Sequence, residues 1–192
     1  MARDFDGTDD VINVANYTKP SSAISGFAWV YWDGINDWST IAKNWGATTA
    51  GQFHFGLDAA AGANTEKLDI IIQQSNGTTI RITDTATMVT GSWQACAFVA
   101  NGATTVTLYK NGSSVGTSSY DGTLKTTSIP NCIGVGHKYN DNCSTLTAGG
   151  AGGDMNGKMA EVGLWSVGLS SSEIYSLSKG VSPNLIRRDK LI

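Results

Sequence analysis

The segment 156–180 constrains the fold of this chain more than any other part of the sequence. Its first half is apolar and rich in residues that favour strands. Ser170 then lies three residues before Glu173, which is the spacing of a helix capping box, and Ile174 and Leu177 lie on one apolar helical face. The segment therefore predicts a strand followed by one short helix.

The rest of the sequence predicts short strands at the spacing of an antiparallel sandwich, roughly every 8–12 residues. Asn76 with Gly77 and Asn111 with Gly112 indicate hairpins, because both central positions of a type I′ turn need positive φ. The predicted strands are 11–14, 24–32, 40–43, 52–57, 68–74, 79–83, 93–100, 105–109, 114–117, 131–137 and 158–165. With a helix at about 171–177, the pattern favours an all-β fold, a two-sheet antiparallel jelly-roll sandwich.

The length suits one domain. A chain of 192 residues can bury the core of a single sandwich. No shift in composition marks an internal boundary, so we expect one domain over residues 1–180 and a C-terminal arm over residues 181–192.

The charge pattern argues against nucleic acid and membranes as partners. The net charge is −3, and the one basic cluster is the terminal Arg187, Arg188 and Lys190, whereas binding to phosphates needs clustered Lys and Arg. No run approaches the ~20 apolar residues of a membrane span. The N-terminus has no apolar core of a secretory signal, so we expect synthesis in the cytoplasm.

The three cysteines do not make a closed disulfide framework. Cys96 lies in an apolar run and is expected to be a small buried hydrophobic residue. Cys132 and Cys143 either pair across a loop or stay reduced, and we expect reduced thiols.

Several segments resemble laminin-G-like domains of the concanavalin A-like lectin/glucanase superfamily. The closing segment matches the pattern G-x-[IM]-A-E-V-x-x-W-x-x-x-L-S-x-x-E-I that ends that fold. The other matching stretches are FDGTDDVINV, ISGFAWVYWDG with Trp29 as the core tryptophan, IAKNWG, FHFGLD, and GSWQACAFVANGATTVTLYKNGSSVGT. The resemblance covers about residues 5–180. It rests mostly on packing and turn residues, so it implies the jelly roll and little chemistry.

The sequence predicts no enzymatic activity. Glycoside hydrolases among the relatives need two carboxylates ~5–9.5 Å apart in one cleft. The three glutamates, Glu66, Glu161 and Glu173, do not form such a pattern, and Glu173 is assigned to the capping box. His54 and His137 lie far apart in the sequence, without metal-ligand spacing around them.

The resemblance also implies a structural calcium ion near the first and last strands. Asp4, Asp6 and Glu161 are the candidate ligands, since calcium takes six to eight oxygens. The alternative, which we favour, is that Asp6 and Asp9 close the turn by accepting hydrogen bonds from backbone amides. No other cofactor is expected.

Three tryptophans, Trp32, Trp38 and Trp45, flank the polar loop 33–39 and its return. Exposed aromatic rings stack on sugars or bury themselves in partner proteins. The alternative is that they fill the end of the core. For Trp32 the two alternatives stay open, and for Trp38 we expect a surface position.

The C-terminal arm carries apolar and basic residues, with Leu185, Ile186, Arg187 and Arg188 as candidate partner contacts. Either the arm adds to a neighbouring subunit or it folds back on its own domain. The opening FDGTDD and the exit SPNLIRRDKL resemble laminin-G-like proteins of tailed phages.

Two hypotheses on function follow. The first is a structural virion protein, a phage capsid decoration or cement subunit located on the virion, whose partners are neighbouring capsid or virion subunits or further copies of itself. The alternative is a lectin-like carbohydrate-binding adhesion module, free or displayed on a virion, whose partners are glycans.

Overall fold

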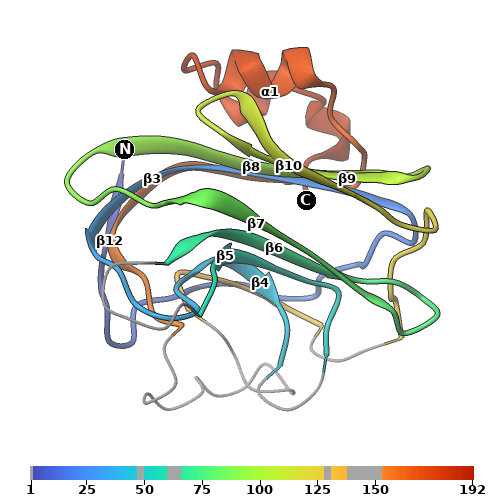
Figure 1. The fold of residues 1–192 in the computed structure, drawn as a ribbon, viewed down its shortest axis with the longest axis horizontal. Helices are drawn as coiled ribbons and strands as arrows, with labels where there is room; N and C mark the ends of the chain where they lie inside the picture. Colours follow the sequence, from blue (N-terminus) through green and yellow to red (C-terminus); the bar gives the residue numbers. More distant parts are fainter. Residues whose placement is uncertain (1, 47–49, 60–65, 128–130, 138–152) are drawn as a thin grey trace.

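The computed structural model describes residues 2–46, 50–59, 66–127, 131–137 and 153–192. Two six-stranded antiparallel sheets face each other (Figure 1). The first sheet has the order β1 (Arg3–Asp6), β12 (Asn156–Trp165), β3 (Ala23–Gly34), β8 (Trp93–Asn101), β9 (Thr105–Lys110), β10 (Ser113–Ser119). The second has the order β2 (Ile12–Val14), β11 (Ile133–Val135), β4 (Thr40–Asn44), β5 (Phe53–Leu57), β6 (Lys67–Gln73), β7 (Thr79–Thr87). The predicted two-sheet antiparallel sandwich is confirmed.

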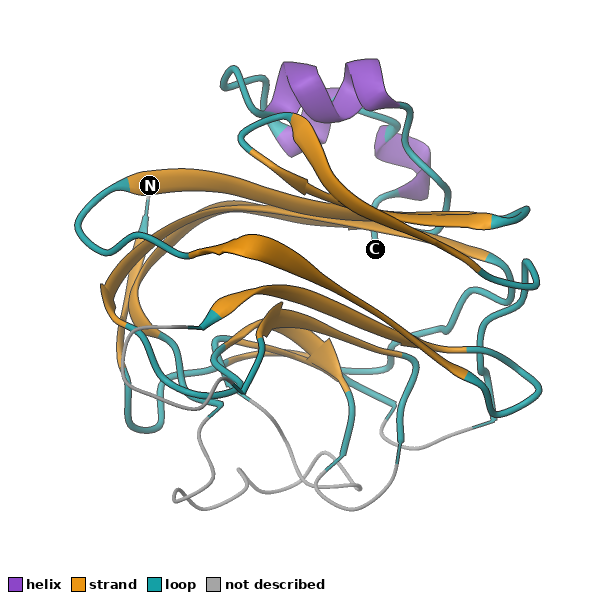
Figure 2. Cartoon of the chain, viewed as in Figure 1, coloured by secondary structure: helices purple, strands orange, loops and turns teal. Residues whose placement is uncertain are grey.

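The predicted helix is also confirmed. Helix α1 (Ser171–Leu177) lies over the outer face of the first sheet, as Figure 2 shows, and two 3-10 turns, η1 (Pro183–Leu185) and η2 (Arg188–Lys190), follow it. Both bonds of the capping box between Ser170 and Glu173 are present. Among the described residues, no helix has the length and hydropathy required to cross a bilayer.

The opening of the chain differs from the prediction. The predicted strand 11–14 corresponds to β2 in the second sheet, but the structure also forms β1 in the first sheet, a strand that was not predicted. Gly7 at φ 77° allows the chain to turn there. The Asp6 side chain accepts from the N–H of Thr8 at 2.8 Å, and Asp10 accepts from the N–H of Asp6 at 3.1 Å.

The two Asn-Gly pairs form different turns. Asn111 and Gly112 have φ of 53° and 82°, as a type I′ turn requires, and they join β9 to β10. Between β6 and β7 only Gly77, at φ 90°, is left-handed, and its N–H donates to the carbonyl of Gln74 at 3.1 Å. The second hairpin is therefore confirmed, whereas the type I′ geometry predicted for the first is wrong.

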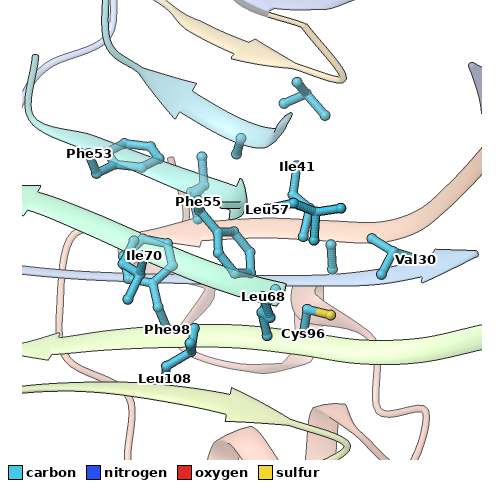
Figure 3. Close-up of a cluster of buried hydrophobic side chains, with 14 of the residues drawn as sticks. Val30, Ile41, Phe53, Phe55, Leu57, Leu68, Ile70, Cys96, Phe98 and Leu108 are labelled. Atoms are coloured by element: carbon cyan, nitrogen blue, oxygen red, sulfur yellow. The ribbon is translucent and has the colours of Figure 1, made fainter. Parts of the chain in front are cut away.

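The main core lies between the two sheets (Figure 3). Phe98 of the first sheet packs against Phe53 and Phe55 of the second, with ring centroids 5.6 and 5.0 Å apart. Trp32 is fully buried in the same core. Most of the inward-facing residues of the central strands are buried there as well. Full burial of each such side chain contributes roughly 1.5–3 kcal/mol, before the entropy of ordering it.

A second core covers the outer face of the first sheet, beneath α1. Phe27 and Trp165 of the sheet form one buried cluster with Ile174 and Leu177 of α1, and further members are Ala95, Ala97, Val99 and Leu169. The C-terminal arm closes this core with Ile186 and Leu191. The indole N–H of Trp165 donates to the carbonyl of Ile186 at 2.7 Å, and the N–H of Ile192 donates to the carbonyl of Leu164 at 2.8 Å. Of the two alternatives for the arm, this chain adopts the one in which it folds back on its own domain.

Cys132 is disulfide-bonded, so the expectation of reduced thiols is wrong for this residue. Cys143, the partner considered for it, lies outside the described residues. The error arose because cysteine spacing alone does not determine which thiols approach one another.

Cys96 is free and fully buried in the main core, where burial raises the pKa of its thiol to about 12. Because the thiolate is the reactive form, Cys96 is expected to resist iodoacetamide in the native protein and to be alkylated once the chain unfolds. Mass spectrometry of tryptic peptides, with and without urea, measures this difference. Equal modification in both samples would contradict the buried position.

Candidate functional site

The outer face of the second sheet is polar, in contrast to its core face. Because side chains alternate along a strand, the residues between the core positions of β4 to β7 face outward. They include Lys43, His54, Asp69, Arg81 and Thr83. Several of these polar or charged side chains are buried although they lie outside the main core. Buried polar side chains on an outer face are unusual, so this face is a candidate site.

A hydrogen-bonded cluster occupies the part of this face formed by β6 and β7. Arg81 donates its Nε to both carboxylate oxygens of Asp69, at 3.1 and 3.2 Å, and the hydroxyl of Thr83 donates to Asp69 at 2.7 Å. Asp69 is 0% exposed, whereas the Arg81 side chain is 41% exposed. Burial raises the pKa of the Asp69 carboxyl, although the hydrogen bonds from Thr83 and Arg81 oppose the shift. The cluster presents a fixed guanidinium group to solvent.

Trp38 lies against this cluster. The Cζ of Arg81 is 5.1 Å from the centroid of the Trp38 ring, and the ring of His54 meets it edge to face at 5.7 Å. Trp38 has a φ of 60°, an uncommon conformation for a bulky residue, and its N–H donates to the carbonyl of Asp58 at 3.1 Å. Backbone strain of this kind clusters at active sites and ligand-binding positions. The result is a partly exposed aromatic ring held beside an arginine.

The three tryptophans predicted as ligand contacts lie in different environments. Trp38 and Trp45 are partly exposed, and for them the prediction stands as a proposal. Trp32 is fully buried, so its predicted contact with a ligand or partner is wrong for this conformation. Alternation along β3 places Trp32 with Val30 on the core side, whereas Tyr31 faces outward.

The predicted calcium ligands do not come together. Asp4 pairs with Lys158, with oxygen and nitrogen 3.8 Å apart, and Asp6 accepts a backbone hydrogen bond within its turn. Glu161 accepts from the hydroxyl of Ser182 at 3.0 Å. Within the described ranges, no three acidic, histidine or cysteine side chains form a group that fits a metal ion. Asp6 follows the alternative in which it closes the turn.

The arm residues predicted as partner contacts divide into two sets. Ile186 packs on the second core, and Arg187 pairs with Glu173 at 2.7 Å, so both are engaged by their own domain. Leu185 is 77% exposed and Arg188 is exposed as well.

Sequence reasoning missed the residues around Trp38, although a signal for them was present. Asp69 is the one charged side chain inside the apolar run LDIII, and Arg81 lies in the strand that forms a hairpin with it. A charged residue in an otherwise apolar strand is expected to be paired, and the hairpin supplies its partner.

The family model described as the Concanavalin A-like lectin/glucanases superfamily, under the name Laminin_G_3, matches residues 6–175. The chain belongs to this superfamily. No curated protein matches its sequence.

Solved structures share the lectin-like fold of this superfamily. A heptameric SAP-like pentraxin from Limulus polyphemus is 14% identical, with a TM-score of 0.67 over 92% of this chain and 81% of that one. Domain 4 of AbnA, an extracellular arabinanase from Geobacillus stearothermophilus solved with arabinotriose, is 17% identical, with a TM-score of 0.64 over 92% and 76%. The carbohydrate-binding module CBM40 of a Ruminococcus gnavus sialidase, bound to sialyllactose, is 12% identical, with a TM-score of 0.60 over 93% and 98%. At these identities the likeness shows the fold.

Proposed function

We propose that this domain binds carbohydrate without catalysing a reaction, at a site built around Trp38 on the outer face of the second sheet. The observation that carries the proposal is the placement of Trp38, a partly exposed ring at positive φ beside Arg81 and His54. Two similar domains were solved with an oligosaccharide, arabinotriose in one and sialyllactose in the other, which supports this class of ligand.

The chemistry of the cluster suits a sugar. The apolar C–H face of a sugar ring packs on an indole, while its hydroxyl groups need hydrogen-bond partners. The bonds from Arg81 to Asp69 use Nε, so the Nη groups of the exposed guanidinium are available as donors to a ligand. Asp69 fixes the orientation of the donor, and Trp38 supplies the flat surface.

The same geometry favours binding over catalysis. A catalytic carboxylate must exchange protons with its substrate. The carboxylate of Asp69 is fully buried and accepts three hydrogen bonds from Arg81 and Thr83, so it acts as a support for Arg81.

A role as a capsid decoration protein is a second proposal, favoured by the exposure of Leu185 on the arm. Ile186 and Leu191, which contributed to the hypothesis of an arm reaching a neighbour, pack on their own domain. Sedimentation of the purified protein with capsid shells tests this role. Binding that is lost in Leu185→Asp is the expected result, and a protein that stays in the supernatant would contradict it.

Replacing Trp38 by alanine is expected to abolish most of the sugar binding at this site. Truncating a central aromatic anchor costs at least about 2 kcal/mol, or about 30-fold in affinity. The measurement is a glycan array probed with the wild type and with Trp38→Ala. The matched control is Tyr175→Ala, which removes another exposed aromatic ring, on α1. Equal array signals for Trp38→Ala and the wild type would contradict the site, and an array without signal for the wild type would contradict the function.

A further inference from the structure

A second row of aromatic and charged side chains crosses the outer face of the first sheet. The strand register aligns Asp4 of β1 with Lys158 of β12, Lys158 with Tyr31 of β3, and Tyr31 with Trp93 of β8. The second core beneath α1 covers a different part of this face, where Phe27 of β3 lies beside Ala97 of β8. The four aligned residues, together with Asp33, are called the Trp93 row.

The aromatic half of the Trp93 row is exposed and held in place. Trp93 is 41% exposed, the most of any tryptophan in the part of the chain that the structure describes. Its ring centroid lies 5.7 Å from that of Tyr31, at an interplanar angle of 62°. Lys158 lies on the other side of Tyr31 along the row, with its Nζ 5.1 Å from the ring centroid. Tyr31 is therefore fixed between two neighbours and supports the indole.

The polar half of the row supplies hydrogen-bond donors and acceptors beside the two aromatic rings. The Nζ of Lys158 lies 3.0 Å from the carboxylate of Asp33 and 3.8 Å from that of Asp4. Both carboxylates are well exposed, so each keeps lone pairs free for a ligand hydroxyl. Lys158 and Trp93 are two strand spacings apart, roughly 10 Å, so the row is longer than one sugar ring.

We propose that the Trp93 row is a second carbohydrate-binding site, distinct from the Trp38 site, and that it takes a neutral oligosaccharide. A ring stacks on Trp93, and the hydroxyl groups of the next unit bind Asp33 and Lys158. Two carboxylates against one ammonium group give the row a net negative charge, which disfavours acidic sugars.

The composition of the surface favours a sugar over a protein partner. Stable protein interfaces bury roughly 800 Å² on each partner around a desolvated apolar centre. Among the described residues of β8 and of the segment 88–92 before it, the large exposed apolar side chains are Trp93 and Val89, and charged groups of both signs lie along the row. One flat aromatic ring beside hydrogen-bonding groups is the composition of a small-ligand site.

The two sites lie on opposite faces of the sandwich, because the Trp38 site is on the outer face of the second sheet and the Trp93 row on that of the first. They can therefore be occupied at the same time. A domain with two sites attaches to a multivalent glycan surface more tightly than either site alone allows.

The experiment is an NMR titration of the protein carrying isotopically labelled tryptophan, in which the six tryptophans give separate indole signals. Trp38→Phe and Trp93→Phe each remove one signal and assign it. The probes are the neutral sugars cellohexaose, xylohexaose and mannohexaose, and the acidic sugar sialyllactose. The buried Trp32 and Trp165 are internal controls.

A saturable shift of the Trp93 signal with a neutral probe, retained in Trp38→Ala, is the expected result. Lys158→Ala is expected to weaken that binding roughly tenfold or more, while native signals from Trp32 and Trp165 show that the variant is folded. A shift of the Trp38 signal alone overturns the second site and leaves the proposed function standing. Shifts of the Trp93 signal with sialyllactose alone overturn the proposal that the ligand is a neutral oligosaccharide. The absence of any shift overturns both sites.

Discussion

Trp165→Ala is expected to destabilise the domain by about 3–5 kcal/mol, the usual cost of removing a large aromatic side chain from a core. Trp165 is fully buried in the second core, and its indole N–H donates a hydrogen bond to the carbonyl of Ile186. The change therefore leaves a cavity and also releases the arm from the sheet. The measurement is the free energy of unfolding from urea titration.

The matched control for this variant is Tyr175→Ala, on the exposed side of α1, the helix that covers the second core. A surface substitution of this kind usually changes stability by no more than about 0.5 kcal/mol. If Trp165→Ala lowered the free energy of unfolding as little as Tyr175→Ala does, the second core would contribute little to stability. The docking of the arm on that core would then be wrong.

Gly157→Ala is expected to lower the free energy of unfolding by about 3 kcal/mol or more. Overpacking and a positive φ at a residue with a Cβ each destabilise the folded state. Gly157 has a φ of 142°, and a Cβ there would overlap the backbone carbonyl of Tyr31 and lie 2.9 Å from the nitrogen of Asp33. The obstacle is backbone of the neighbouring strand β3, which no side-chain rotation relieves. Thermal and urea unfolding measure the loss.

Gly77→Ala separates the two causes. Gly77 also has positive φ, 90°, but nothing lies within 4 Å of an added Cβ. The free energy of unfolding of Gly77→Ala is therefore expected to fall only by the cost of the backbone conformation, about 1–2 kcal/mol. Equal losses for the two variants would contradict the close approach of β12 to β3 at Gly157.

The sequence predicted those parts of the fold that depend on local patterns. The bounds of α1 follow from the Ser170 and Glu173 capping box, whose two partners are three residues apart and need no tertiary contact to be recognised. The hairpin at Asn111 and Gly112 is specified in the same way by two adjacent residues.

The remaining errors concern contacts between segments distant in the sequence. Alternation along β3 separates Trp32 from Tyr31, but both faces of the first sheet carry apolar side chains because a second core lies beneath α1. Alternation alone therefore did not show which face held the main core. The site was missed for a similar reason, since the contacts of Arg81 with Trp38 and Asp69 depend on how three separate segments meet.

The most direct test of carbohydrate binding at Trp38 is a crystal structure of the protein grown with the oligosaccharide whose array signal falls most in Trp38→Ala. The expected result is a sugar ring packed on the Trp38 indole, with a hydroxyl group accepting a hydrogen bond from Arg81. A sugar bound only elsewhere on the domain, with Trp38 and Arg81 uncontacted, would contradict it.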